Sequence, residues 1–234
     1  MSTGRVLVIV PAHNEEESLP VTLDELARKA PDFDVLVVDD GSRDGTAEVA
    51  RARGIPVISH AVNLGVGGAL QTGFRWAVRS GYAIGVQLDA DGQHDPGFLP
   101  VLLAPVLSGA CDVSIGSRYV SRSGYRAPLA RRMGMLLFST VFRVAVGQRI
   151  TDTTSGYRAY DRAVMEVCQH EFPKDFPDAP LLIDLARRGF RLTEVPVEMR
   201  AREAGRSFYT LGKSLYYPYK NLLASLMVLL KRPG

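Results

Sequence analysis

The stretch that decides the fold runs V-Q-L-D-A-D-G-Q-H, from Val86 to His94. An apolar run breaks off there into two aspartates one residue apart, Asp89 and Asp91, followed by a glycine and the amide of Gln93. This pattern predicts a buried strand whose C-terminal end delivers oxygen ligands into a crevice. Mg²⁺ and Mn²⁺ favour such ligands and usually keep water and substrate phosphates in their other positions. The competing interpretation is an acidic turn, because Asp and Gly are ordinary turn residues.

Segments typical of strands and of helices alternate on both sides of this motif. Apolar runs predict strands at residues 6–10, 35–38, 55–58, 83–88, 112–115 and 190–197. Apolar residues at helical spacing predict helices at residues 15–29, 133–146, 180–188 and 209–231, the first with an acidic first turn. Asp44 or Ser42 is expected to cap a helix through Ala47 and Ala50, and the glycine-rich segment 63–73 is expected to open a helix that ends near Ser80. The alternation predicts an α/β fold with a mainly parallel, Rossmann-like sheet and helices on both faces.

Ligands in such folds bind beyond the carboxyl ends of the strands. Three chemically distinctive segments follow predicted strand ends: residues 11–15, the pair Asp39-Asp40, and residues 89–93. We therefore expect these three segments to converge on one edge of the sheet.

The composition is that of a folded protein without a bias toward nucleic acid. Of 234 residues, 46% are hydrophobic and 23% are charged, and the formal net charge of +3 is too small to indicate a nucleic-acid partner. Cys111 and Cys168 lie far apart with no C-x-x-C motif, so neither a disulfide framework nor a zinc site is indicated. We see no signal peptide and no apolar run of the ~18–20 residues that a spanning helix needs. We therefore expect a cytoplasmic protein with reduced thiols.

No internal repeat and no flexible linker divides the chain, so we expect one domain over residues 1–208. Residues 209–234 are expected to form a C-terminal amphipathic helix. An apolar face, basic flanks and three tyrosines (Tyr216, Tyr217 and Tyr219) are typical of a helix in a membrane interface. Residues 133–146, an apolar segment preceded by arginines, are a second candidate. Packing of either helix on the protein core is the alternative.

Seven motifs follow one another along nearly the whole chain. They are V-I-V-P-A-H-N-E-E-E (8–17), V-V-D-D-G-S-R-D-G-T (37–46), N-L-G-V-G-G-A-L-Q-T-G (63–73), L-D-A-D-G-Q-H (88–94), G-S-R-Y (116–119), D-T-T-S-G-Y-R-A-Y (152–160) and R-E-A-G-R-S (202–207). In this order and spacing they make the chain resemble family 2 glycosyltransferases of the GT-A fold, and within them the dolichyl- or polyprenyl-phosphate sugar synthases.

The resemblance implies a nucleotide-sugar site at the ends of the first two strands. Pro11, His13 and Glu15 would line the nucleotide pocket, and Glu15 would accept hydrogen bonds from ribose hydroxyls. Asp39 would accept the ring N–H of a uracil or a guanine, and Asp40 would support the pocket. Plain helix capping is the alternative role for Glu15.

The resemblance also implies a Mg²⁺ or Mn²⁺ ion at the D-x-D motif, held by Asp89, Asp91 and Gln93. Such a metal offsets charge on the departing nucleoside diphosphate and contributes as a Lewis acid. Asp89 and Ala90 would border the donor as well. Three glycines would let the backbone approach the donor closely, with helix–sheet packing as their alternative role: Gly65, Gly67 and Gly68.

The acceptor phosphate would be bound by Arg118 of G-S-R-Y, by Arg131 or Arg132, and by Ser155. Arg202 matches a basic position that the family places against donor phosphates or the acceptor. A guanidinium recognises phosphate oxygens through two parallel hydrogen bonds, so several arginines together define an anionic pocket. A solvated surface position remains the alternative for each arginine taken singly.

A lipid monophosphate is its own nucleophile, because its oxygen is already ionised at neutral pH, and no strong general base is then required. Asp178 and Asp184 are the only candidates for a base in the corresponding region. The main hypothesis is an inverting, metal-dependent transfer of a sugar from a UDP- or GDP-linked donor to a polyprenyl or dolichyl phosphate. The enzyme would act as a peripheral protein at the cytoplasmic face of the membrane, where a small transmembrane subunit is a candidate partner.

Two rival hypotheses remain open. One keeps the fold but transfers the sugar to a saccharide hydroxyl in cell-envelope polysaccharide synthesis, and it is favoured if Asp178 or Asp184 is essential. The other is a non-catalytic nucleotide-sugar-binding subunit, which would tolerate the loss of Asp91.

Overall fold

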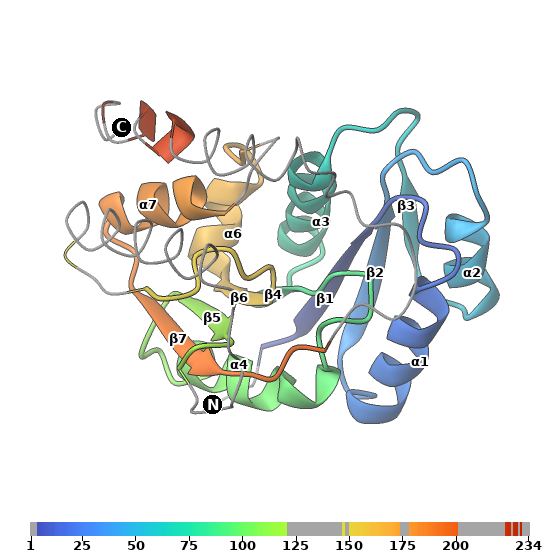
Figure 1. The fold of residues 1–234 in the computed structure, drawn as a ribbon, viewed down its shortest axis with the longest axis horizontal. Helices are drawn as coiled ribbons and strands as arrows, with labels where there is room; N and C mark the ends of the chain where they lie inside the picture. The colour runs from blue at the N-terminus through green and yellow to red at the C-terminus, as the bar shows by residue number, and fades with distance from the viewer. Residues whose placement is uncertain are drawn as a thin grey trace, which may run out of the picture.

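The computed structural model describes residues 4–120, 147, 150–173, 178–200, 223–225, 227, 228 and 230. In these residues a seven-stranded sheet lies between two layers of helices (Figure 1). The strands are β1 (Val6–Ala12), β2 (Asp34–Asp39), β3 (Val57–Ser59), β4 (Ile84–Gln87), β5 (Val113–Ser117), β6 (Arg158–Asp161) and β7 (Leu192–Pro196). The helices are α1 (Leu19–Lys29), α2 (Thr46–Ala52), α3 (Val66–Arg79), the short 3₁₀ helix η1 (Pro96–Phe98), α4 (Leu99–Leu107), α6 (Arg162–Cys168) and α7 (Ala179–Arg187).

The strands are ordered β3-β2-β1-β4-β6-β5-β7 and run parallel except for β6, which is antiparallel to β4 and β5. This arrangement confirms the predicted mainly parallel sheet. Strand β1 lies inside the sheet and is buried on both faces, which is why its apolar run is continuous rather than alternating. The strand extends through Pro11 to Ala12, two residues past its expected end.

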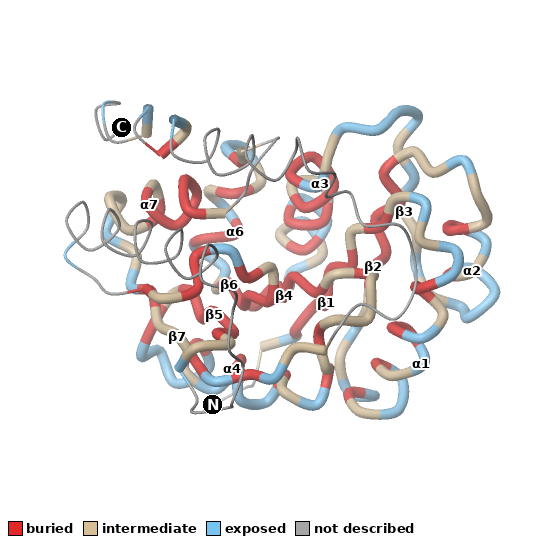
Figure 2. Tube along the Cα trace, in the orientation of Figure 1, coloured by how far each residue is buried: buried red, intermediate tan, exposed pale blue. Residues whose placement is uncertain are grey.

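Each face of the sheet carries its own apolar layer (Figure 2). Val8 and Val10 of β1 belong to the layer that includes α1 and α4, while Leu7 and Ile9 belong to the layer that includes α3, α6 and α7. Burying one such side chain contributes roughly 1.5–3 kcal/mol. Packing on both faces therefore fixes the central strands, and with them the loops that leave their carboxyl ends.

The first helix begins at Leu19 and not at Glu15, so the prediction of an acidic first turn was wrong. The backbone N–H groups of Ser18 and Leu19 donate to the carbonyl of Glu15 at 3.2 and 2.8 Å, which closes a turn ahead of the helix. Pro20 lies in the first turn of α1, where its missing N–H has no cost. Glu15 consequently stays in the loop at the end of β1.

Four elements were not predicted: η1, α4, β6 and α6. Helix α4 contains prolines near its start and in its interior, and both positions disguise a helical pattern. Strand β6 has only four residues, two of them charged, and α6 has only seven residues. Each is too short to give a clear periodicity.

The expected helix at residues 133–146 lies outside the described residues, as does most of the segment 209–234. The described part of the C-terminal segment is helical and lies beside α7, where Arg187 donates to the carbonyl of Val228 (Figure 1). Leu223, Met227 and Leu230, one helical turn apart, are exposed. Within the described residues, every helix is too short or too polar to cross a membrane.

Candidate active site

The carboxyl ends of β1, β2 and β4 lie side by side at one edge of the sheet (Figure 1). Ala12 of β1 is in register with Asp39 of β2, and Ile9 of β1 is in register with Gln87 of β4. Because the three strands are parallel, the loops that follow them leave the sheet at the same edge. The structure thus brings together the three segments that the sequence singled out.

His13 and Asn14 join the end of β1 to the turn after β2. Nδ1 of His13 lies 2.9 Å from the carbonyl of Asp40, and because a carbonyl can only accept, this nitrogen carries the proton. The Asn14 N–H donates to Oγ of Ser42 at 3.0 Å, and Oδ1 of Asn14 accepts from the N–H of Arg43 at 2.9 Å. Asn14 has a φ of 54°, which Asn tolerates better than most residues. These hydrogen bonds therefore hold the loop after β1 against the turn after β2.

Pro11 and Glu15 flank this junction. Pro11 is half-buried in β1. The Glu15 N–H donates to Oγ1 of Thr46 at 2.9 Å, and its carboxylate accepts the hydroxyl of Ser18. The second contact supports a structural role for Glu15 in the turn before α1.

The two aspartates of the D-D-G-S turn are both buried but have different partners. Oδ1 of Asp39 accepts the backbone N–H of Ser42 at 3.0 Å and so closes the turn. Oδ1 of Asp40 instead receives hydrogen bonds from Nδ1 of His60 at 2.8 Å and from the N–H of Leu64 at 2.9 Å. Asp40 therefore connects β2 with the loop that opens α3.

The glycine-rich segment at the start of α3 contains glycines with different roles. Gly65 precedes the helix with a φ of 83°, a conformation that side chains rarely adopt. Gly67 and Gly68 are buried, and a Cβ on Gly68 would lie 2.6 Å from Cβ of Leu64. Packing thus accounts for Gly68, whereas Gly65 is required by the backbone turn.

Hydrogen bonds within the D-x-D loop, to α1 and to the segment after β7 hold this loop in place. Oδ1 of Asp91 accepts the N–H of Gln93 at 3.1 Å. Gln93 in turn donates through Nε2 to the carbonyl of Arg200 at 3.2 Å, and the backbone carbonyl of Gln93 accepts the N–H of Arg200 at 3.0 Å. The hydroxyl of Thr22 in α1 donates to the carbonyl of Ala90 at 3.0 Å. The loop is therefore held against both α1 and the segment after β7.

His94 supports Asp89, a function that the sequence analysis did not assign. Its Nδ1 accepts the backbone N–H of Asp89 at 3.1 Å, and its ring stacks on Tyr157 with the ring centroids 4.9 Å apart. Burial raises the pKa of the Tyr157 phenol, which donates to the carbonyl of Asp95 at 3.2 Å. The H at the end of L-D-A-D-G-Q-H was the signal that could have identified this support.

The oxygen atoms at this edge are suited to a hard divalent cation. The Asp89 side chain is 37% exposed, and Asp91 and Gln93 are also partly accessible. Across the described residues, no group of three or more His, Cys, Asp or Glu side chains is arranged to hold a metal by itself. Carboxylate and amide oxygens are ligand types that Mg²⁺ and Mn²⁺ accept, usually with water or phosphate oxygens in the remaining positions.

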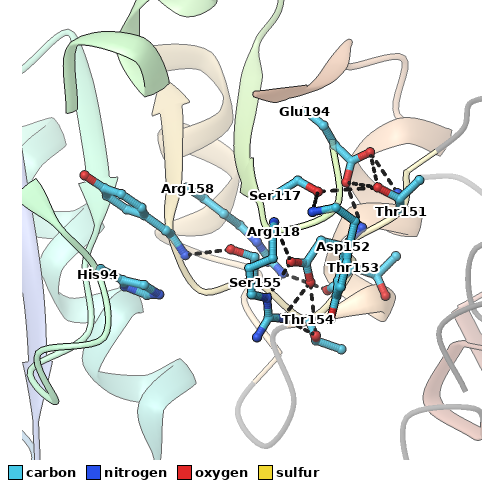
Figure 3. A network of polar contacts seen from close by, with 12 residues as sticks. His94, Ser117, Arg118, Thr151, Asp152, Thr153, Thr154, Ser155, Arg158 and Glu194 are labelled. Carbon is cyan, nitrogen blue, oxygen red and sulfur yellow. Dashed lines mark hydrogen bonds and ion pairs between the residues drawn. The ribbon is translucent and has the colours of Figure 1, made fainter. Parts of the chain in front are cut away.

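Arg118 is bound to a carboxylate of the same chain (Figure 3). Its Nε and Nη2 donate to the two oxygens of Asp152, each at 2.8 Å, and Nη2 also contacts Oγ1 of Thr154 at 3.2 Å. Glu194 of β7 accepts the N–H groups of Thr151 at 2.8 Å and of Asp152 at 2.7 Å. Sequence reasoning missed Asp152 and Glu194 as the groups that fix this arginine and its loop.

Ser155 is buried, and its Oγ accepts the N–H of Tyr157 at 3.3 Å, so it stabilises the loop from within. Nη2 of Arg158, which is fully buried, donates to the carbonyl of Thr153 at 3.0 Å. Next to Ser155, a Cβ on Gly156 would lie 2.7 Å from Oδ2 of Asp89. The D-T-T-S-G-Y loop therefore touches the D-x-D motif directly.

Three of the predicted phosphate-binding arginines, Arg131, Arg132 and Arg202, lie outside the described residues. Of the two candidates for a general base, Asp184 lies on α7 and pairs with Nε of Arg188 at 2.8 Å. Asp178 immediately precedes α7. Asp184 is thus engaged in an ion pair on its own helix.

Comparison with known proteins places this chain in a family. The sequence profile of glycosyl transferase family 2 matches residues 7–168. The chain belongs to glycosyl transferase family 2. It is therefore a glycosyltransferase, and the resemblance drawn from its motifs is confirmed.

Two curated relatives match almost their whole length. The chain is 40% identical over 217 residues to an undecaprenyl-phosphate mannosyltransferase of Micrococcus luteus, covering 87% of this chain and 86% of the relative. It is 39% identical over 216 residues to a polyprenol monophosphomannose synthase of Mycolicibacterium smegmatis, covering 88% of this chain and 81% of the relative.

The fold is shared with glucosyl-3-phosphoglycerate synthase of Mycobacterium tuberculosis, whose structure was solved with Mn²⁺ and UDP-glucose. The TM-score is 0.72 at 24% identity, over 97% of this chain and 79% of that one. This similarity confirms the GT-A fold.

Proposed function

We propose that this glycosyltransferase moves a sugar, with mannose as the first candidate, from a nucleotide sugar to polyprenyl phosphate with inversion at the anomeric carbon. The observation that carries the proposal is the D-x-D motif at the end of β4, beside the ends of β1 and β2, in a chain 40% identical to an undecaprenyl-phosphate mannosyltransferase. Ligands of parallel α/β sheets bind at such an edge.

The donor nucleotide is assigned to the surface formed by the loops after β1 and β2. Asp39 is the candidate for the ring N–H of guanine or uracil, and Pro11, His13 and Glu15 are candidates for the walls of the pocket. The hydrogen bond from His13 to the Asp40 carbonyl supports this assignment, because it joins the two loops through the protein's own groups. A preformed pocket spends less binding energy on ordering its own side chains.

Asp89 and Asp91, with the amide of Gln93, are assigned to hold Mg²⁺ or Mn²⁺. The bound cation supplies Lewis-acid stabilisation of the charge that develops on the leaving diphosphate. The contribution of the chain is to fix the carboxylates. His94 holds the backbone of Asp89, and Gln93 is tied to Arg200.

The acceptor is assigned to the side of the site formed by Arg118 and the D-T-T-S-G-Y loop. A phosphate monoester oxygen attacks without help from a strong base. The ion pair of Asp184 with Arg188 supports this assignment, because it occupies one of the two candidates for a base. Asp152 holds Arg118 in one orientation, which suits an arginine that positions an anion.

Contact with the membrane is assigned to the C-terminal segment. Leu223, Met227 and Leu230 form an exposed apolar row on the described part of its helix, as an interfacial helix requires. The enzyme would then work as a peripheral protein at the inner face, with or without a small transmembrane partner.

The test is transfer from radiolabelled GDP- and UDP-linked sugars into an organic-extractable polyprenyl phosphate, with Mn²⁺ or Mg²⁺ and with excess EDTA. We expect labelled lipid from GDP- or UDP-linked mannose and no product in EDTA. Parallel reactions contain saccharide acceptors in place of the lipid. Label in a saccharide but never in lipid would replace this proposal with transfer to a hydroxyl. Nucleotide-sugar binding without any transfer would favour a non-catalytic subunit.

A further inference from the structure

The loop between β3 and α3, residues 60–65, is held at the site mainly by polar contacts. Val62 and Leu64 are 63% and 49% exposed, so burial of apolar surface does little to fix it. Two of its hydrogen bonds go to the Asp40 carboxylate, from His60 and from the N–H of Leu64, and the backbone N–H of His60 donates to the carbonyl of Asp39 at 2.8 Å. This loop carries the start of the N-L-G-V-G-G motif and leads into Gly65, whose φ of 83° opens α3.

His60 is the side chain that joins this loop to both of its neighbours. Its Nδ1 lies 2.8 Å from Oδ1 of Asp40, and its Nε2 lies 2.9 Å from Oγ1 of Thr72 in α3. The same Asp40 oxygen accepts the N–H of Leu64 at 2.9 Å. One imidazole therefore bridges the turn after β2 and the first turns of α3, and a single carboxylate holds the loop at both ends.

The backbone of the D-D-G-S turn makes a second contact with this loop. Gly41 has a φ of 68°, and a Cβ at this position would lie 2.7 Å from the carbonyl carbon of Val62 and 2.8 Å from the nitrogen of Asn63. Glycine is therefore required at position 41 for two reasons: the backbone has a positive φ, and a side chain would clash with the backbone of Val62 and Asn63. The turn and the loop lie in direct contact, so the position of one determines the position of the other.

Asp40 does not need to touch a ligand to matter in this arrangement. Its carboxylate is almost fully buried, and both the carboxylate and the backbone carbonyl are engaged, the former by His60 and Leu64 and the latter by His13. A buried carboxylate that loses a partner is costly, so the imidazole and the carboxylate hold each other in place. Asp40 connects three loops, those after β1, β2 and β3.

We infer that His60 is a positioning residue for the nucleotide part of the donor. It locks Asp40 and thereby presets the loop at residues 60–65 against the D-D-G-S turn, where the proposed function places the nucleotide. The inference rests on that proposed function. A preset loop lowers the ordering cost of binding, so its loss weakens nucleotide affinity and leaves the chemical step unchanged.

The experiment uses the full chain with Mn²⁺ and measures calorimetric dissociation constants for GDP and UDP. His60→Leu removes both hydrogen bonds, while His60→Asn retains an N–H donor near the position of Nδ1. We expect the dissociation constant to rise at least about tenfold for His60→Leu and about threefold for His60→Asn. His170→Asn, at an exposed histidine, is the matched control and should bind as the wild type does.

Steady-state kinetics separate positioning from general destabilisation. For His60→Asn we expect a raised KM for the donor, with kcat and the KM for polyprenyl phosphate unchanged. If His60→Leu fails to fold, His60→Asn decides alone. An unchanged dissociation constant and donor KM in folded His60→Asn would overturn the inference. A wild-type protein that binds neither nucleotide would overturn the proposed function and the inference with it.

Discussion

The proposed donor edge and the proposed acceptor side of the site are built in different ways. At the donor edge, formed by the loops after β1, β2 and β4, the carboxylates of Asp89 and Asp91 are partly exposed and are held through backbone hydrogen bonds. On the acceptor side, formed by Arg118 and residues 151–157, the charged groups are paired with one another. Asp152 is 1% exposed and binds an arginine that is itself only 21% exposed.

We interpret the difference as one between carboxylates that are accessible to a ligand and charged groups that hold a loop in place. Oxygens left accessible at a strand end are available to a cation, whereas a buried carboxylate needs its own counter-charge. Substitutions of the partly exposed Asp89 and Asp91 should therefore reduce turnover at little cost in stability. Substitutions in the acceptor-side network should reduce stability first.

The largest effect is expected at the donor edge. Asp91→Ala removes one of two carboxylates from the proposed metal site, so we expect kcat to fall roughly a thousandfold. Its melting temperature should stay near that of the wild type, because Asp91 is partly exposed. The measurement is initial-rate transfer with saturating Mn²⁺, together with thermal unfolding.

Asp32→Ala, at an exposed acidic residue in a turn, is the control for the loss of a surface carboxylate. It should keep full turnover. Equal rates for Asp91→Ala and the wild type would contradict the assignment of the donor edge.

The next effect concerns stability on the acceptor side. Asp152→Asn removes the charge that pairs with Arg118 and replaces one acceptor with a donor, so we expect a loss of about 2–3 kcal/mol in the free energy of unfolding. Asp24→Asn is the matched control, because Asp24 pairs with Arg53 but is 65% exposed. That control should cost less than about 1 kcal/mol. Urea denaturation measures both, and similar losses would mean that burial of the pair is unimportant.

A smaller effect is expected where the two regions touch. A Cβ on Gly156 would lie 2.7 Å from Oδ2 and 3.1 Å from Oδ1 of Asp89. Because a carboxylate can rotate away, Gly156→Ala should fold but displace Asp89, with kcat reduced about tenfold. The result to measure is a weaker apparent Mn²⁺ affinity in the transfer assay.

Gly81→Ala is the comparison for this variant. Gly81 has a φ of 79° and open space around it, in a turn before β4. Its substitution should cost stability through backbone strain and leave Mn²⁺ dependence intact. If Gly156→Ala has the same profile as Gly81→Ala, the two regions are not mechanically connected.

The smallest effect is an acid-dependent loss of stability at Asp95, whose carboxylate pairs with Lys29 and Arg200. Burial acts to raise the pKa of Asp95, but the hydrogen bond from Lys29, the N–H of Gly97 and the charge of Arg200 lower it below its usual range. A carboxyl group whose pKa is lowered by folding stabilises the protein at pH values above its pKa in the unfolded chain. This stabilisation is lost as the pH falls through the pKa of the folded state. Asp95→Asn should therefore cost about 1 kcal/mol near neutrality.

The stability difference between wild type and Asp95→Asn should shrink as the pH falls below about 4. Urea midpoints over a pH series measure it. A difference that stays constant from neutral pH into strong acid would show that the charge of Asp95 contributes nothing.

The convergence of the loops after β1, β2 and β4 could be predicted from sequence because the information for it is local. An apolar run followed by Asp89-Ala90-Asp91 indicates both a strand and a set of oxygen ligands within a few residues. Parallel strands bring the loops at their carboxyl ends together. The acceptor side depends on contacts over long sequence distances, as between Arg118 and Asp152 or between Thr151 and Glu194. No periodicity reveals such pairs.

Two further features lay beyond sequence reasoning for a related reason. Arg158 is fully buried although arginine is normally a surface residue, so the short strand β6 that it begins gave no apolar signal. Glu15 lies ahead of α1, where its backbone N–H donates to Oγ1 of Thr46 in α2 at 2.9 Å. In both cases tertiary contacts decided an element that local patterning left open.

The most direct test of the donor edge is a crystal structure with Mn²⁺ and GDP or UDP, with the metal located from its anomalous scattering. We predict a Mn²⁺ peak within bonding distance of Asp89 or Asp91, a diphosphate bound to that ion, and a base beside Asp39. A nucleotide bound elsewhere, or a metal peak away from both aspartates, would contradict the account.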